Sequence, residues 1–159
     1  MERRRWVGAE PWSDGQLGCG GPGVARSAAR PLGEADRDPQ TAEILGAAVE
    51  VHCTLAREFL EAVYQRALCL ELRQRGVPYV SEAPVPVRYK GEDLGCQYRA
   101  DVICWPEDEP VLLELKALTR LTDVERAQVL HYVRASRIRR ALLLNFGAER
   151  LEIQRFVNG

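Results

Sequence analysis

One short segment limits what this chain can become. Residues 111–117 read VLLELKA, an apolar run typical of a β-strand that nevertheless contains an acid and an amine. Glu114 and Lys116 are two residues apart, so in a strand both side chains point to the same face. Burying these groups costs free energy unless they pair with each other or bind a metal ion. The segment therefore predicts either a buried ion pair or a metal site.

The segments around this strand predict an α/β domain. Their order is two helices, three strands in a meander, a third helix and two final strands, which favours one mixed sheet. The expected helices cover about residues 39–55, 58–75 and 123–136, and the expected strands cover 85–89, 94–105, 111–117, 140–146 and 151–156.

The ends of the three expected helices carry recognisable signals. Asp38 is a good N-cap, and Pro39 suits the first helical position. Gly76 is a plausible stop for the second helix. Thr122 and Glu125 are spaced as a capping box at the start of the third helix. These signals support the predicted boundaries independently of the apolar pattern.

The first 38 residues differ in composition from the rest of the chain. They contain 7 of the 13 glycines and 3 of the 9 prolines, and aliphatic residues are scarce among them. Such a segment buries too little apolar surface to offset the entropy lost on ordering. We expect residues 1–38 to be a disordered tail and residues 39–159 to form the folded domain.

Charge and cysteine content exclude several classes of protein. The 22 Lys and Arg residues against 23 Asp and Glu give a net charge of -1, so any nucleic-acid contact must come from a local patch. No apolar run approaches the roughly 18 residues of a transmembrane helix. The five cysteines lack zinc-site spacing, and no secretory signal is recognisable, so we expect a cytoplasmic protein with no membrane partner.

A second carboxylate stands among apolar residues of the preceding strand. Adjacent antiparallel strands can bring Asp101 beside Glu114. Two carboxylates and the backbone carbonyl of Leu115 would make an oxygen-rich site suited to Mg²⁺. Lys116 could then orient a water or stabilise charge developing on a phosphate. The alternative is an ion pair with no chemistry.

Three more polar residues could belong to the same site. Glu61 lies in an apolar helical run and could reach a metal cluster, or it could be an ordinary solvated glutamate. Gln128 and Tyr132 are four residues apart on the third helix, where with Val124 and His131 they form the expected inward stripe. Buried polar groups need partners, which an acidic site would supply. The alternative is a surface pair.

In combination these segments resemble the GxxExxY family, a branch of the PD-(D/E)xK nuclease-like superfamily. The resemblance covers nearly all of residues 40–157. It rests on residues 50–52 (EVH), 59–64 (FLEAVY), 98–101 (YRAD), 114–117 (ELKA), 128–132 (QVLHY) and 143–146 (LLNF).

The resemblance implies a restriction-endonuclease-like core, with a mixed central β-sheet flanked by helices. It implies Mg²⁺ or Mn²⁺ as cofactor and nucleic acid as partner, with DNA favoured over RNA and a homodimer left open. The implied catalytic residues are Asp101, Glu114, Lys116, Gln128 and Tyr132, and the implied metal ligands are Asp101, Glu114, Leu115 and Glu61.

The sequence departs from the family at the glycine that gives the family its name. Glu58 stands in that position, and residues 55–58 read LARE in place of the usual Leu-Gly-Pro-Gly. Glycines in such a turn permit positive φ or close backbone approach. Their loss predicts that the first two helices meet differently or continue as one. His52 also matches a family position, and we expect it to be a core histidine rather than a ligand.

Two functions follow as hypotheses. The first is a metal-dependent nuclease that hydrolyses phosphodiester bonds by metal-activated water attack. The second is a catalytically silent nucleic-acid- or protein-binding module that retains the fold. The intact set of Asp101, Glu114 and Lys116 favours the first. A basic cluster could contact phosphates or could simply complement a helix C-terminus; its members are Arg134, Arg137, Arg139 and Arg140.

Overall fold

The computed structural model describes residues 38–157, which contain three helices and five strands. Their order along the chain is the predicted one. The first 37 residues of the predicted tail lie outside the described residues. No helix in the described part is long and apolar enough to cross a membrane. The elements are α1 (Pro39–Leu55), α2 (Glu61–Gln74), β1 (Tyr79–Tyr89), β2 (Glu92–Cys104), β3 (Val111–Lys116), α3 (Asp123–Ser136), β4 (Arg140–Asn145) and β5 (Glu152–Val157).

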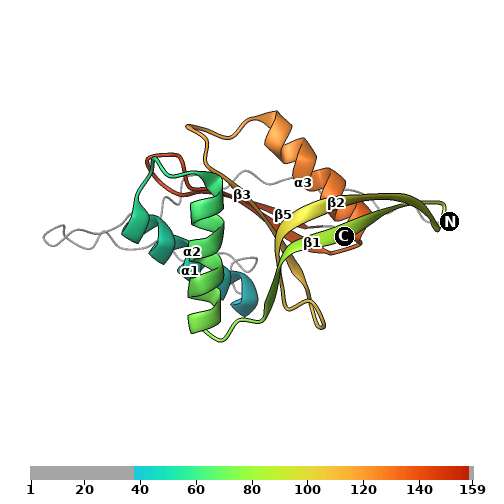
Figure 1. Cartoon of the computed structure of the whole chain (residues 1–159), viewed down its shortest axis with the longest axis horizontal. Helices are drawn as coiled ribbons and strands as arrows, with labels where there is room; N and C mark the ends of the chain where they lie inside the picture. The colour runs from blue at the N-terminus through green and yellow to red at the C-terminus, as the bar shows by residue number, and fades with distance from the viewer. Residues whose placement is uncertain (1–37, 158–159) are drawn as a thin grey trace, which may run out of the picture.

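The five strands form one mixed sheet in the order β1-β2-β3-β4-β5. Neighbours pair antiparallel except β3 and β4, which are parallel. A parallel pair needs a crossover connection, and α3 supplies it. The mixed α/β architecture predicted from the order of the elements is confirmed (Figure 1).

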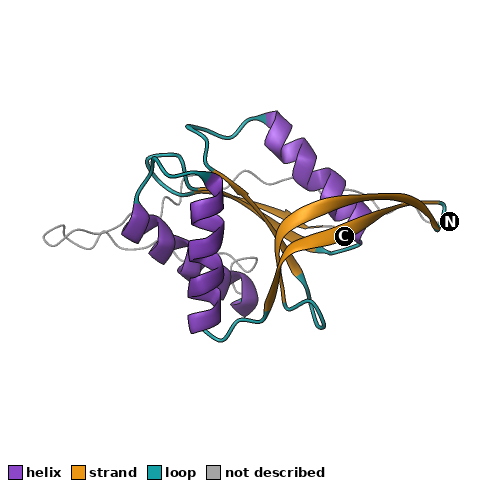
Figure 2. Ribbon diagram, in the orientation of Figure 1, coloured by secondary structure: helices purple, strands orange, loops and turns teal. Residues whose placement is uncertain are grey.

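The helices cover both faces of the sheet (Figure 2). On one face, α1 and α2 pack against Leu113 and Leu115 of β3 in the larger apolar cluster. On the other face, α3 packs against Leu112 in a second cluster. Because side chains alternate along a strand, Glu114 points to the same face as Leu112, toward α3. The predicted division of the two faces of this strand is therefore confirmed.

The hairpin of β1 and β2 extends well beyond the rest of the sheet (Figure 1). Residues 92–99 of β2 are all exposed. β2 pairs with β3 only over Val102–Cys104, so the two strands part just before Val102. β1 begins at Tyr79, six residues earlier than predicted, because its first residues pair with the inner end of this long β2.

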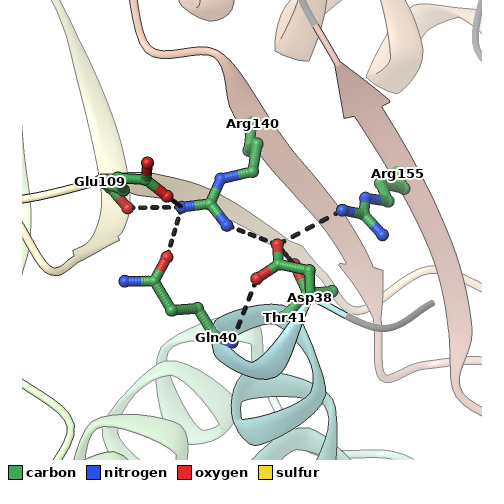
Figure 3. A network of polar contacts seen from close by, with 6 residues as sticks. All are labelled: Asp38, Gln40, Thr41, Glu109, Arg140 and Arg155. Atoms are coloured by element: carbon green, nitrogen blue, oxygen red, sulfur yellow. Dashed lines mark hydrogen bonds and ion pairs between the residues drawn. The ribbon is translucent and has the colours of Figure 1, made fainter. Parts of the chain in front are cut away.

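A polar network fastens the start of α1 to the sheet (Figure 3). As predicted, Asp38 caps α1, accepting hydrogen bonds from the Gln40 backbone N–H (3.1 Å) and the Thr41 hydroxyl (2.7 Å). Its carboxylate also pairs with Arg140 and Arg155. Burial opposes ionisation of Asp38, but the hydrogen bonds from Thr41 and Arg140 outweigh it and lower its pKa.

The guanidinium of Arg140 donates its hydrogen bonds to members of this network. It donates to the Gln40 side chain and to the Glu109 backbone carbonyl (2.7 Å) as well as to Asp38. Of the basic cluster recognised in the sequence, this member is a structural anchor between α1 and β4.

Two residues of the turn between α1 and α2 have positive φ angles, although neither is glycine. Ala56 has φ 55° and Glu58 has φ 87°, so α1 ends at Leu55 and α2 starts only at Glu61. The alternative of one continuous helix was wrong. The Tyr64 hydroxyl fixes the turn, because it donates to the Ala56 carbonyl (2.8 Å) and accepts from the Phe59 N–H (3.3 Å).

Candidate active site

The parting of β2 from β3 brings two carboxylates together. The β2–β3 register, continued one residue beyond Val102 and Leu113, places Asp101 opposite Glu114. Instead of a backbone carbonyl, the Asp101 carboxylate accepts the Leu115 N–H, with Oδ2 2.7 Å from the nitrogen. The expected proximity of Asp101 and Glu114 follows from this arrangement.

Glu114 and Lys116 form an ion pair on the face of β3 that points toward α3. Lys116 Nζ lies 2.7 Å from Glu114 Oε1, and the two side chains are only 14% and 3% exposed. The second carboxylate oxygen, Oε2 of Glu114, is buried and has no hydrogen-bond partner among the described residues. An unsatisfied buried acceptor is costly. A cation bound at Oε2 would satisfy it, so the donor set fits a hard divalent metal ion.

The pKa values of the site are set by burial first and by neighbouring charges second. Burial raises the pKa of Asp101 to about 6, against a usual value of 3.8. Burial, and secondly the charge of Asp101, raise the pKa of Glu114 to about 7. For Lys116, burial opposes the charged amine, but the hydrogen bond to Glu114 outweighs it and raises the pKa. The site thus holds a charged lysine and two acids that a metal ion would stabilise in ionised form.

Glu61 and Leu115, the other two predicted ligands, differ in how near they lie to the two acids. Glu61 is the first residue of α2, and its charge contributes to the raised pKa of both Asp101 and Glu114. Leu115 lies between Glu114 and Lys116, with its N–H held by Asp101. Within residues 38–157, however, no three acidic, histidine or cysteine side chains converge as a ready metal centre. Glu61 is therefore within electrostatic reach of the two acids but does not join them in such a centre.

Gln128 and Tyr132 approach the same site from α3. Gln128 Nε2 donates to the Tyr132 hydroxyl at 2.8 Å, and Tyr132 packs on Tyr98 of β2 with ring centroids 5.0 Å apart. Burial raises the pKa of Tyr132, and the nearby charge of Glu114 adds to the effect. The Gln128–Tyr132 pair is thus a partly buried contact on the side of α3 that faces the sheet.

The predicted inward stripe of α3 was wrong for two of its members. Val124 is 73% exposed, and His131 is also exposed. The buried residues of α3 are Val129, Tyr132 and Val133. These three are spaced as neighbours on one helical face, which leaves Val124, in the first turn, and His131 outside the contact with the sheet.

Comparison with known proteins identifies the family. The model of the PD-(D/E)XK nuclease superfamily matches residues 38–156. This chain belongs to that superfamily. The crystal structure of SSO0001 has a similar fold, with a TM-score of 0.50 and 14% identity over 61% of this chain and 49% of that chain. The similar region thus spans about half of SSO0001. The curated proteins contain no significant sequence match.

Membership of the nuclease superfamily confirms the family resemblance at the level of the superfamily, together with the restriction-endonuclease-like fold. The narrower assignment to the GxxExxY branch stays a prediction. So do the roles of the individual site residues, whose positions are described above.

Three polar residues beside Asp101 were missed by sequence reasoning. The β1–β2 register places Glu82 opposite Asp101, on the side away from Glu114. Gln65 of α2 donates to Glu82 Oε1 (2.5 Å) and to the Asp101 backbone carbonyl (3.1 Å). Arg99 forms an ion pair with Glu82. The register of the hairpin brings these residues together, and the sequence around Glu82 does not indicate that register.

The loop that follows Lys116 is held by Asn145 at the end of β4. Its amide oxygen accepts the Leu118 N–H (2.8 Å), and its amide nitrogen donates to the Leu118 carbonyl (2.9 Å) and to Glu152 (2.6 Å). At Gly147 a Cβ atom would lie 2.5 Å from the Ala117 backbone, so only glycine allows this approach. These contacts fix the chain directly after β3, the strand that carries Glu114 and Lys116.

His52 has the core position expected of it. It is buried in α1, and its Nε2 donates to the Ala148 carbonyl at 3.2 Å. The ring also lies against Phe146, with centroids 6.4 Å apart. His52 thus secures the turn after β4 from the α1 side.

Proposed function

We propose that this protein is a metal-dependent nuclease that hydrolyses phosphodiester bonds of nucleic acid, with DNA favoured over RNA. The observation that carries the proposal is the buried, unpartnered Oε2 of Glu114 opposite Asp101, in a chain that belongs to a nuclease superfamily. A divalent cation would satisfy the unpartnered oxygen and would offset the negative charge of the two acids.

Asp101, Glu114 and the Leu115 carbonyl are the proposed ligands of Mg²⁺ or Mn²⁺, and Glu61 adds negative charge at the N-terminus of α2. An ion held there would supply Lewis-acid activation of a water and charge neutralisation at the phosphate. The raised pKa of Lys116 keeps its amine protonated at neutral pH. Lys116 therefore acts as a cation that orients the water or stabilises the phosphate oxygens, and not as a general base.

Gln128 and Tyr132 are proposed to support the reaction from α3. The Tyr132 hydroxyl accepts a hydrogen bond from Gln128, which leaves its own proton available as a donor. The pair can thereby hold a water or a phosphate oxygen on the side of Glu114 that faces α3.

The second candidate is a nucleic-acid-binding module without turnover. It is favoured by one observation: within residues 38–157 no three acidic, histidine or cysteine side chains already converge as a metal centre. The two candidates differ most at Lys116. In an enzyme its loss lowers the rate of the chemical step, whereas in a binding module there is no rate to lose.

The test compares single-turnover cleavage and binding of labelled single- and double-stranded DNA and RNA, with Mg²⁺, Mn²⁺ or EDTA. Lys116→Ala is expected to slow cleavage by roughly a hundredfold or more while metal binding persists. Lys116→Arg is also expected to be slow, because a planar guanidinium cannot replace a compact ammonium. Lys90→Ala, in the exposed turn that follows β1, is the matched control.

Three results would decide against the proposal. Absence of cleavage with every substrate and both metals, together with retained binding, favours the binding module. Cleavage that is unchanged in Lys116→Ala assigns the activity to another site. Absence of divalent binding by titration calorimetry at millimolar ion removes the metal from the mechanism.

A further inference from the structure

An exposed ion pair at the base of the β1–β2 hairpin lies next to the candidate active site. Arg99 pairs with Glu82, and the two side chains are 72% and 43% exposed. Gln65 holds Glu82 through one hydrogen bond and the Asp101 backbone carbonyl through another. The pair is thus connected to the same stretch of β2 that carries Asp101.

The position of Arg99 relative to Asp101 is set by the strand. The two residues are two apart on β2, so their Cα atoms are about 7 Å apart. Arg99 is also the only basic residue among residues 92–105. Arg99 is therefore an exposed cation two residues from Asp101 along β2.

We propose that Arg99 binds a backbone phosphate neighbouring the one at the Asp101–Glu114 site, and that Glu82 holds the Arg99 guanidinium when no nucleic acid is bound. The inference rests on the proposed function, since it assumes that nucleic acid reaches this site. It assigns substrate binding to Arg99 at the base of the hairpin, outside the residues that carry the chemistry.

The exchange of Glu82 for a phosphate is chemically simple. A guanidinium presents a fork of N–H donors that fits carboxylate and phosphate oxygens in the same bidentate manner. Exposed ion pairs contribute little to stability, so leaving Glu82 costs little. Lys116 is paired with the buried Glu114, and Arg140 belongs to the Asp38 network. Within residues 38–157, the side chain of Arg99 has Glu82 as its ion-pair partner, and both groups of that pair are exposed.

The experiment measures binding of a fluorescent single-stranded DNA by anisotropy, with Ca²⁺ in place of Mg²⁺, over a series of salt concentrations. Arg99→Gln is expected to weaken binding and to reduce the slope of log K against log salt by about 0.7, the value for one phosphate contact on a single strand. Arg73→Gln is the matched control, because it is exposed near the far end of α2 from Glu61. Its slope and affinity should be those of the wild type.

The Glu82 variant tests the competition. Glu82→Gln is expected to strengthen binding about threefold, the change that corresponds to an exposed ion pair of ordinary strength. In the Arg99→Gln background the same substitution should give no gain, since the carboxylate would have no guanidinium to hold.

Two results would overturn the inference: a wild-type salt slope in Arg99→Gln, or a Glu82→Gln gain that persists without Arg99, which would indicate general repulsion. Either result with intact Mg²⁺ binding and cleavage overturns only this inference. An Arg99-dependent slope in a protein that never cleaves nucleic acid overturns only the proposed nuclease activity. Failure of the wild-type protein to bind DNA or RNA overturns both.

Discussion

Glu114 should destabilise the metal-free protein when it is ionised. Burial first, and the charge of Asp101 second, raise its pKa from 4.5 to about 7. Each pKa unit is worth about 1.4 kcal/mol, so above pH 7 the ionised form costs about 3 kcal/mol of stability. Between pH 4.5 and 7 the folded chain binds more protons here than the unfolded chain. The stability contributed by this group is therefore present at low pH and is lost as pH rises through about 7.

Glu114→Gln replaces the acid by a neutral group of the same shape. Without metal, the variant should unfold with a free energy about 3 kcal/mol higher than the wild type at pH 8, and about 1 kcal/mol or less higher at pH 5. The glutamine oxygen can still accept a hydrogen bond from Lys116. The charges of Asp101 and Glu61 also remain near the lysine in this variant. The measurement is urea unfolding followed by circular dichroism, in EDTA at both pH values. Glu107→Gln, an exposed position, is the control and should change little.

A bound metal ion should stabilise the wild type but not Glu114→Gln. Mg²⁺ or Mn²⁺ should raise the thermal midpoint of the wild type, because the ion binds the native state preferentially. Glu114→Gln should lose that increment. If the variant is instead less stable than the wild type at pH 8 in EDTA, the ion pair with Lys116 outweighs the burial of charge. The physical argument for a metal ion at this site would then fail.

Three other perturbations test the fold around the site. Asp38→Ala should lower the free energy of unfolding by about 3 kcal/mol in urea, because it removes an N-cap and leaves two arginines without their shared carboxylate; an effect below about 1 kcal/mol would mean that the network contributes little. Glu58→Gly should raise the unfolding free energy by about 1 kcal/mol, since φ at this residue is 87°, whereas a loss in the same assay would contradict strain. Residues 38–159 alone should have the thermal midpoint of the full chain by calorimetry, and a clear drop would show that the preceding residues stabilise the domain.

Local periodicity explains which parts of the structure were predictable. The two faces of β3 follow from alternation within a few residues, so the sequence alone indicated that Glu114 and Lys116 share a face with Leu112. The capping box of α3 is also local, and it is present as predicted. Signals of this kind need no knowledge of the rest of the fold.

Features that depend on distant segments were not predictable in the same way. The first six residues of β1 were not predicted as strand, because their pairing with the inner end of β2 leaves no local signal. Pro84 and Pro86 are tolerated in β1 because it lies at the edge of the sheet. The contact of Glu82 with Arg99 depends on the hairpin register, which a bulge near Pro86 also shifts. Val124 was placed inward from spacing alone, but only the position of the sheet decides which face of α3 is covered.

The candidate site and the end of strand pairing have a common physical cause. β2 stops pairing with β3 beyond Val102, so the Leu115 N–H would lose its place in a backbone ladder. Asp101 supplies the missing acceptor with its side chain, and this holds its carboxylate where the two strands separate. In a continued ladder the register would place Ala100 opposite Leu115, and a backbone carbonyl of β2 would accept this N–H instead. The separation that exposes the hairpin is therefore also where Asp101 and Glu114 come together, and Arg99 is the first basic residue along the separated strand from Asp101.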